Sequence, residues 1–490
     1  MVRVRRNVLN LDAGDRTLHW YSLAVEAMQA IPPTQYDSWW FQANIHGDPD
    51  RSTFNPYFSR CQHQSWYFLP WHRGYITAFE AIVADKVARL GGPSDWALPY
   101  WDYTEPLSVQ PYARYLPEAF RAPTQDGTRN PLFSRRNTPP SGKVGLTDTQ
   151  VSRAALKEDV FSRAGEGVPP GFGGPPTGFS HAGQVSGELE SVPHNVVHVQ
   201  VGGNMGLVEL AARDPIFWLH HANIDRLWEM WHQEPNHDEP TDPAWRSGQR
   251  FTLHDGSGAV FHFDCNDMID TRAVLHGYVY DDLDNVETDE DEMRQTVHQT
   301  ANKRLALEVF MRDDREPELI GTSDSSLDLL SGAPVATLSL QTGRQRLMTL
   351  KSGDFGPPPR AYLNLENIKG SGQPGDFMVY VDVPDDDLEP VPAGLLTTFG
   401  LTVASDPASE HGGSGLTRIL DITPVAERLG LRDGSDTLQV SFEPLQPERS
   451  DAADGYIPHE MELAMETDEM RGAMDEPPSI TVGRISLYIE

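Results

Sequence analysis

The chain has 490 residues, of which 38% are hydrophobic, and its formal net charge at pH 7 is -33. This length predicts two domains, and the strongly negative charge excludes electrostatic binding to nucleic acids or to anionic membranes. Because the chain has only two cysteines, Cys61 and Cys265, a disulfide framework beyond a single bond is excluded.

The N-terminal stretch, MVRVRRNVLNLD, lacks the apolar segment of a signal peptide. No run of about 18 apolar residues follows it anywhere in the chain, so we expect no membrane-spanning helix. The sequence therefore predicts a soluble protein and, without an evident signal peptide, a cytoplasmic one. It gives no indication of the oligomeric state.

Three histidines in the first helical part of the chain form one group. His46, His63 and His72 occur in the stretches NIHG and CQHQSWYFLPWHRGY. His72 falls on an apolar stripe with helical spacing, which consists of Tyr75, Ile76, Phe79, Ile82, Val83 and Val87. An imidazole on the buried face of a helix is costly unless it is paired or ligated. The pattern therefore favours a metal ligand over a structural histidine.

A second group of histidines follows an irregular segment, 104–180, that is rich in Pro, Gly and Arg. His194 and His198 are spaced i and i+4 in PHNVVH, so they point the same way from a helix. His221, in DPIFWLHHANIDRLW, falls on a helical stripe with Phe217, Ile224, Trp228 and Trp231. His220 lies on an adjacent face, and helical geometry alone does not choose between His220 and His221.

The pattern changes in the last third of the chain. The run from Asp281 to Glu292 is acidic and turn-prone, which is typical of a solvated linker. Beyond it, short segments such as VATLSLQ, DFMVYVDV and RISLYIE alternate apolar with polar residues and are separated by Gly, Pro and Asp. We therefore expect a mainly α domain over residues 1–283, an acidic linker over 284–304, and a β-sandwich over 305–490.

Three neutral imidazoles per site suit copper, which favours nitrogen ligands. With the stretches quoted above, the two triplets resemble the type 3 copper proteins, meaning tyrosinases, catechol oxidases, polyphenol oxidases and hemocyanins. The resemblance implies a four-helix-bundle core with long loops around two copper ions. Through LENIKGSGQPGDFMVYVDVP, LDIT and VGRISLYIE, the C-terminal domain also resembles that of latent polyphenol oxidases, which implies an active-site shield. The alternative is a stabilising or oligomerising domain.

Matched residue by residue, the family pattern implies a ligand set for each copper ion. One copper takes His46, His63 and His72, and the other takes His194, His198 and His221. The pattern favours His221 over His220, which then has a supporting or structural role. Cys61 in CQH resembles the cysteine that some members join to the second ligand, here His63, by a thioether bond. The alternative is a small buried thiol, as we expect for Cys265.

The resemblance also implies residues that act on the substrate. Glu190 and Asn195 match a Glu and an Asn that position a water, and this water takes the proton from a phenol. The alternative for Glu190 is a surface carboxylate in a loop. Val199 and Val208 are expected at the substrate pocket, where neither could bind a carboxylate. The pocket is therefore predicted to be apolar.

Two supporting positions complete the predicted site. Asp225, one turn beyond the last ligand, is a candidate hydrogen-bond acceptor for a ligand, or else an ion-pair partner of Arg226. Tyr278 and Tyr280, in GYVYD, match the YxY motif that closes the catalytic domain of the family. An arginine near the N-terminus is expected to stack there, and the candidates are Arg5 and Arg6.

The sequence is thus interpreted as a copper-dependent phenol oxidase. We expect it to use O2 to oxidise o-diphenols to o-quinones and to hydroxylate monophenols in the ortho position. Its predicted partners are small phenols and O2, with neither nucleic acid nor membrane. An o-aminophenol oxidase shares the metal site, and a hemocyanin-like oxygen-binding protein is a third possibility. The pairing of Glu190 with Asn195 favours an enzyme.

Overall fold

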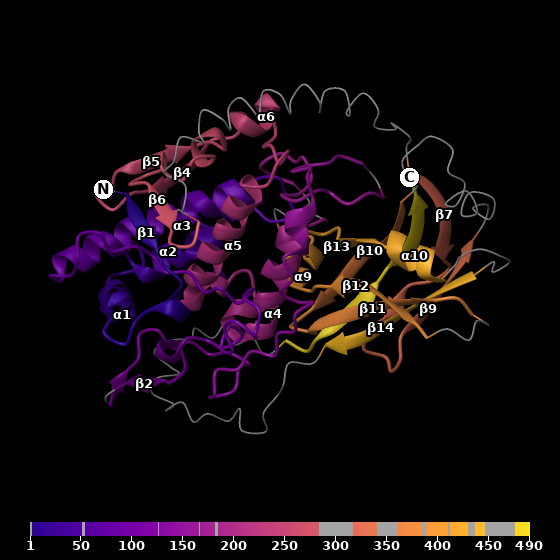
Figure 1. Ribbon diagram of the computed structural model, residues 1–490, viewed down its shortest axis with the longest axis horizontal. Coiled ribbons are helices and arrows are strands. Elements are labelled where there is room, and N and C mark those ends of the chain that lie inside the picture. Colours follow the sequence, from indigo (N-terminus) through magenta and orange to yellow (C-terminus); the bar gives the residue numbers. More distant parts are fainter. Residues whose placement is uncertain are drawn as a thin grey trace.

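The computed structural model describes two domains that follow each other along the chain (Figure 1). The described residues are 2–50, 54–125, 127–165, 167–181, 185–283, 317–340, 360–384, 389–409, 412–429, 437–445 and 476–490. The predicted linker, 284–304, lies outside them. The expected fold class, a mainly α domain followed by a β domain, is confirmed. No helix among the described residues is long and apolar enough to cross a membrane.

The first domain is built around helices joined by long irregular segments. The α-helices are α1 (Thr17–Gln29), α2 (Trp39–His46), α3 (Phe68–Arg89), α4 (Val196–Val201), α5 (Ile216–His232) and α6 (Pro243–Arg246). A π-helical turn, η4 (Glu190–Asn195), leads directly into α4. Single 3-10 turns lie at η1 (Val8–Asn10), η2 (Glu118–Phe120), η3 (Ala154–Lys157), η5 (Gly203–Gly206), η6 (Ala211–Arg213) and η7 (Asn266–Met268).

Helices α2, α3 and α5 form because their apolar residues recur at helical spacing and meet in one core. Ser38 caps α2, since its hydroxyl accepts the backbone N–H of Trp40. Helices α3 and α5 meet where the rings of Phe79 and Trp218 stack. Each large apolar side chain buried in this way contributes about 1.5–3 kcal/mol to folding. The core therefore fixes the helices that carry the histidines.

Short strand pairs close the first domain. Strand β1 (Arg3–Arg5) pairs in parallel with β6 (Tyr278–Tyr280), which brings the two ends of the domain together. The other pairs are antiparallel and join β2 (Thr124–Gln125) to β3 (Thr128–Arg129), and β4 (Phe251–His254) to β5 (Val260–Phe263).

The described residues of the second domain form a ten-stranded sheet with its own hydrophobic core. The strands follow the order β12-β11-β14-β9-β7-β16-β10-β15-β8, and β13 pairs with β10. They are β7 (Glu318–Ser323), β8 (Leu327–Asp328), β9 (Val335–Leu340), β10 (Ala361–Ser371), β11 (Asp376–Asp382), β12 (Val391–Leu396), β13 (Leu416–Asp421), β14 (Thr437–Leu445), β15 (Ser479–Val482) and β16 (Arg484–Ile489). Alternate residues of β11 and β14 are buried, as expected for strands with one face on a core. Two short helices, α9 (Leu401–Ser405) and α10 (Thr423–Leu429), follow β12 and β13.

The β domain is docked beside α4 of the first domain (Figure 1). Val185 and Thr417 form a parallel β-bridge between the domains. Gln373 donates from Nε2 to the carbonyl oxygen of Gly203 over 3.1 Å. A separate apolar cluster joins residues of both domains, namely Val168, Val185, Tyr362, Ile419 and Tyr488. The domains thus share polar and apolar contacts within the described residues.

Candidate metal centre

The first triplet of histidines comes from α2, α3 and the loop between them. His46 is the last residue of α2, His63 lies in the loop, and His72 lies in the second turn of α3. The centroid of the His46 ring is 5.2 Å from that of His63 and 5.6 Å from that of His72. The His63 and His72 rings are 5.2 Å apart. The structure therefore brings the three predicted ligands together.

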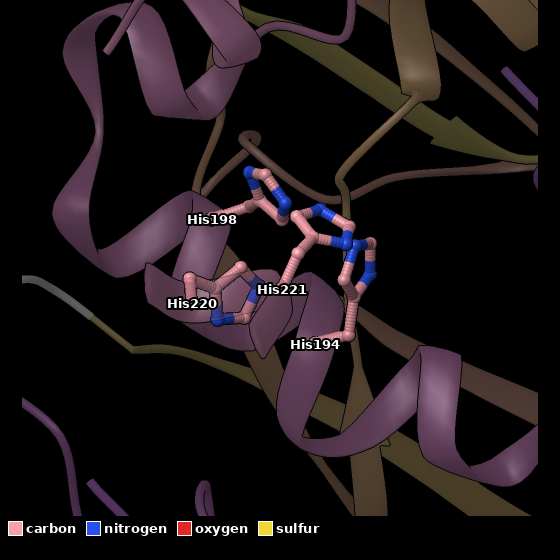
Figure 2. A group of neighbouring side chains, drawn as sticks. All are labelled: His194, His198, His220 and His221. Carbon is pink, nitrogen blue, oxygen red and sulfur yellow. The ribbon is translucent and has the colours of Figure 1, made fainter. Parts of the chain in front are cut away.

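The second triplet comes from η4, α4 and α5. The centroid of the His194 ring is 4.6 Å from that of His198 and 4.9 Å from that of His221. In Figure 2 these three rings form a row, and the ring of His220 lies to one side of it. One ligand atom from each of the four histidines lies within 4.8 Å of the others. Distance alone thus admits His220 as well as His221.

The two triplets face each other across a narrow gap. The rings of His72 and His221 stack with centroids 4.5 Å apart and an angle of 12° between their planes. His63 and His194 are 5.8 Å apart on the other side. Ligand atoms of His46, His72 and His221 also form a group within 4.8 Å. This arrangement suits two metal ions held side by side.

The hydrogen bonds of the rings leave Nε2 available to a metal. Four Nδ1 atoms have a partner that can only accept a hydrogen bond, which fixes the proton on Nδ1. These contacts join His46 to Val208 O (2.9 Å), His72 to Phe68 O (2.8 Å), His198 to Met205 O (2.7 Å) and His194 to Asn195 Oδ1 (2.8 Å).

Nε2 of these four rings then carries a lone pair, and within the described part of the chain it has no hydrogen-bond partner. Both nitrogens of His221 likewise lack a partner among the described residues. Buried polar atoms in proteins normally have one, and an all-imidazole donor set suits copper. The residues therefore fit a pair of copper ions.

Burial keeps these imidazoles neutral. It lowers the pKa of His46 to about 4 and the pKa of His194 to about 3. The pKa values of His72, His198 and His221 are also lowered by burial, and neighbouring histidines add to the effect. Neutral rings are the form that binds a metal.

Cys61 lies beside the first triplet, and its thiol is buried. Its Sγ belongs to a group with ligand atoms of His46 and His63 in which all atoms lie within 4.8 Å of one another. Burial raises the pKa of the Cys61 thiol, so the free residue is an unreactive thiol at neutral pH. Cys265 is buried in the hydrophobic core, as expected for a structural residue.

Glu190 is buried at the edge of the site and is not a surface carboxylate. Only 2% of the residue is exposed, and both carboxylate oxygens accept the backbone N–H of Gln64 over 2.9 Å. Gln64 adopts a left-handed backbone conformation, with φ at 55°. Burial raises the pKa of Glu190 to about 8, although the N–H of Gln64 acts in the opposite direction. Asn195 is also buried and orients His194 through its side-chain oxygen.

A small cavity of about 50 Å³ opens beside the histidines. His63, Glu190 and Val208 line it from the first domain. Val199 is not among the described residues that line it. Of the two valines expected at the pocket, the structure places only Val208 there.

Phe399 is a site residue that sequence reasoning missed. It follows β12 in the second domain, and its ring stacks on His198 with centroids 4.0 Å apart and an interplanar angle of 16°. The same ring is 5.6 Å from His194 and 5.8 Å from His63, edge-on to both. Only 3% of Phe399 is exposed. The β domain thus fills the mouth of the histidine site with one aromatic side chain.

Asp225 does not have either role expected from the sequence. Its carboxylate accepts hydrogen bonds from four distant side chains instead of a ligand or Arg226, namely Arg5, Arg73, Tyr278 and Tyr280. Arg226 pairs with Asp102 and Asp282. The physical reason is that charged donors satisfy a buried carboxylate better than a neutral imidazole does.

In the same network, Arg5 and not Arg6 stacks on the YxY motif. The guanidinium of Arg5 lies 3.5 Å from the centroid of the Tyr278 ring, and its Nε donates to Glu80 over 2.8 Å. Arg6 is instead paired with Asp15 near the surface. Asp225 and Arg5 therefore hold the two ends of the first domain together.

Family comparisons match both domains. Residues 36–234 match the model described as the common central domain of tyrosinase, and residues 316–454 match a model described as a domain of unknown function. The chain is 34% identical to a tyrosinase from Hahella sp. (strain CCB-MM4), over 92% of this chain and 97% of that protein. It is 29% identical to aureusidin synthase from Antirrhinum majus, over 58% of this chain and 52% of that protein.

Solved structures share the fold. Latent apple tyrosinase matches with a TM-score of 0.59 at 19% identity, over 100% of this chain and 97% of that chain. Latent aurone synthase, a polyphenol oxidase, matches with a TM-score of 0.57 at 18% identity, over 100% of this chain and 89% of that chain.

Proposed function

The chain belongs to the tyrosinase family and is a type 3 copper oxidoreductase, and from this premise we propose that it oxidises o-diphenols to o-quinones and hydroxylates monophenols. Two o-diphenols each lose two electrons and two protons, and one O2 takes them up to form two waters. With a monophenol, one oxygen atom of O2 enters the ring and the other leaves as water, so that the product is again an o-quinone. The observation that carries the proposal is the pair of facing histidine triplets, in which Nε2 of His46, His72, His194, His198 and His221 has no hydrogen-bond partner among the described residues.

We assign the ligands as expected from the sequence, with one triplet for each copper. The sets are His46, His63 and His72, and His194, His198 and His221. When bound, the copper pair would supply O2 binding and the uptake of electrons from the phenol. The protein holds the rings through backbone carbonyls, which fixes their tautomers and directions. Phe68, Trp71 and Phe217 pack against the rings and keep bulk water out.

Glu190 is the proposed base for monophenols. Its carboxylate lines the cavity beside His63, where a phenol would enter. A pKa near 8 matches a group that can accept a proton close to neutral pH. The proton of the phenol would pass through a water held between Glu190 and Asn195. Asn195 also keeps Nδ1 of His194 protonated, so its side chain has two functions.

Cys61 is the proposed partner of His63 in a thioether bond, supported by the closeness of the sulfur to the ring nitrogens. The bond forms between Sγ and a ring carbon. The thiol and that carbon each lose a hydrogen, and O2 takes both hydrogens with two electrons to give hydrogen peroxide. A ring fixed in this way keeps one orientation. The product is lighter than the unmodified chain by two hydrogen atoms, which intact-mass measurement detects after copper loading in air.

The β domain is the proposed shield of the active site. Phe399 occupies the position above His198 that an aromatic substrate would need, and the remaining cavity of about 50 Å³ is too small for a phenol ring. Arg418 supports the docking, since its Nη1 donates to Ser191 Oγ over 3.0 Å and its Nη2 lies 3.5 Å from a carboxylate oxygen of Glu188. The two partners lie on either side of Glu190 in the chain. The contacts of Arg418 and the ring of Phe399 therefore act on one segment of the first domain.

The test uses copper-loaded full-length protein with tyramine, catechol and o-aminophenol, before and after limited proteolysis within 284–304. We expect o-quinone from tyramine and catechol, at rates that rise several-fold after cleavage. Oxidation of o-aminophenol alone would favour the aminophenol oxidase. Oxygen binding without oxidation of any of these compounds, before or after cleavage, would favour the hemocyanin-like alternative.

Copper content tests the ligand assignment separately. We expect two coppers per chain in the wild type and one in His221→Ala. His237→Ala is the matched control, because His237 is another buried histidine but stacks on Trp231, outside both triplets. Two coppers in His221→Ala would contradict the assignment.

A further inference from the structure

Helix α5 presents two adjacent histidines to the same metal site. His220 and His221 are both fully buried, and ligand atoms of both lie within 4.8 Å of those of His194 and His198. The His220 ring stacks on His194 with centroids 5.2 Å apart and meets His198 edge-on at 4.8 Å. If the second copper takes three imidazoles, something must decide which of the two neighbours is the third. Distance does not make that choice.

The hydrogen bond of His220 differs in kind from those of the other rings. Nδ1 of His220 lies 2.9 Å from the hydroxyl oxygen of Tyr103, which is itself fully buried. A backbone carbonyl can only accept, whereas a hydroxyl can also donate. If the Tyr103 hydroxyl donates to Nδ1, the proton of the neutral imidazole must sit on Nε2. An Nε2–H has no lone pair to give to a metal.

The surroundings of Tyr103 favour donation. Burial raises the pKa of its phenol, so the hydroxyl keeps its proton. Within the described part of the chain, the Tyr103 hydroxyl has one hydrogen-bond partner, Nδ1 of His220. A buried hydroxyl that keeps its proton needs an acceptor for it, and the lone pair of Nδ1 is the acceptor within reach. The proton of the phenol is therefore directed to His220.

The segment that carries Tyr103 is anchored to α5. The backbone N–H of Trp101 donates to the carbonyl oxygen of Leu219 over 3.2 Å, one residue before His220. The N–H of Tyr103 in turn donates to the carbonyl oxygen of Trp101 over 3.1 Å. The phenol is therefore fixed relative to the helix that bears both histidines.

We propose that Tyr103 selects the third ligand of the second copper by holding His220 in the Nε2–H tautomer, which leaves His221 to bind the metal. His220 is then a positioning residue that packs against His194 and His198. This inference rests on the proposed ligand set. It adds a residue, Tyr103, that no motif of the sequence assigns to the site.

The first test reads the tautomer directly in copper-free, full-length protein. Selective ¹⁵N labelling of histidine allows NMR to distinguish Nδ1–H from Nε2–H rings, and His220→Gln identifies the signal by its loss. We expect His220 to be Nε2–H in the wild type and His194 and His198 to be Nδ1–H. A wild-type His220 in the Nδ1–H form would overturn the proposal, and this measurement needs no bound copper.

The second test is a rescue of copper binding. His221→Ala should hold one copper per chain, and the double variant Tyr103→Phe/His221→Ala should regain part of the second because His220 is free to ligate. Tyr21→Phe/His221→Ala is the matched control, since Tyr21 is also fully buried and donates to the carbonyl oxygen of Pro215, away from the histidines. Equal copper loss in both double variants would overturn the proposal. A wild type without two coppers would instead refute the proposed function.

Discussion

Truncation of Phe399 to Ala should activate the full-length enzyme without proteolysis. Only 3% of Phe399 is exposed and its ring stacks on His198, so the truncation removes a contact of the kind that costs about 3–5 kcal/mol in a core. If about 3 kcal/mol of that cost falls on docking, the population of open molecules rises by about two orders of magnitude. The truncation also leaves a ring-sized hole beside the existing cavity of about 50 Å³. A diphenol can therefore enter even while the β domain remains docked.

The assay compares initial diphenolase rates of copper-loaded wild type, Phe399→Leu and Phe399→Ala on a small catechol, with copper content measured for each. We expect the rates to rise in that order by at least about tenfold overall, because Leu fills only part of the space. Phe442→Ala is the matched control, since Phe442 is buried in the core of the β domain, which contains none of the histidines of the two triplets among its described residues. If Phe399→Ala is no faster than wild type while protease-trimmed wild type is faster, the block lies elsewhere in the β domain.

Three further predictions follow from the same contacts. Arg418→Ala should lower the detergent concentration needed for activation, because it removes contacts of the β domain with the first domain. Arg484→Ala should leave that concentration unchanged, because Arg484 forms an ion pair within the β domain. Identical detergent curves for the two variants would argue against a docking role of Arg418. Glu190→Gln should lower the ratio of monophenol to diphenol turnover at unchanged copper content, and an unaltered ratio would exclude it as the base. Burial raises the pKa of Asp376 to about 8, so the folded chain keeps a proton that the unfolded chain loses from about pH 4. The protonated side chain therefore contributes fully to the stability of the fold below that pH, and its contribution falls as the pH rises to 8, by up to about 1.4 kcal/mol per pH unit. Asp376→Asn should flatten the fall in Tm between pH 5 and 9. Parallel Tm curves for the wild type and the variant would contradict this.

The sequence predicted the parts of the site that local spacing encodes. His72 and His221 stand on apolar stripes of helices, and the i, i+4 pair His194 and His198 points one way because a helix repeats every 3.6 residues. Those rules place each ring on the inner face of its own element. The core then brings the elements together, since each stripe has only the other stripes to pack against.

The errors and omissions come from contacts between residues far apart in the chain. Asp225 looked like a neighbour of a ligand because it lies one turn from His221, yet Arg5 and Arg73 reach it from the N-terminus and from α3. Such partners are invisible to spacing within one helix. Tyr103 was missed for the same reason, since its segment is brought to α5 by long-range contacts such as the bond from Trp101 to Leu219.

Phe399 was equally hidden, because it stands in a loop with neither helical nor alternating pattern. The one local sign is Gly400, whose φ of 81° marks a turn and so presents the preceding side chain at a tip. A glycine after an aromatic residue in a loop is too common to identify a plug. What identifies it is the docked position of the whole β domain, to which contacts along the length of the interface contribute.

The plug is held as part of the β domain rather than as a loose loop. The N–H of Thr398 donates to the Asp376 carboxylate over 3.0 Å, and its hydroxyl donates to the carbonyl oxygen of Gly375 over 3.1 Å. Nε of Arg418 donates to the carbonyl oxygen of Leu395, while its other nitrogens reach the first domain. Swinging Phe399 out alone would break these bonds with no new partners inside the interface, at about 1 kcal/mol or more for each. If the β domain moves as a rigid body, the hydrogen bonds within it are kept, and the groups at the interface bind water instead of the first domain. Opening of the site by displacement of the whole β domain is therefore favoured. Cutting the connection between the domains lowers the effective concentration of the β domain at the site. It does not remove the contacts that hold the β domain there, so these contacts limit how far cleavage activates the enzyme.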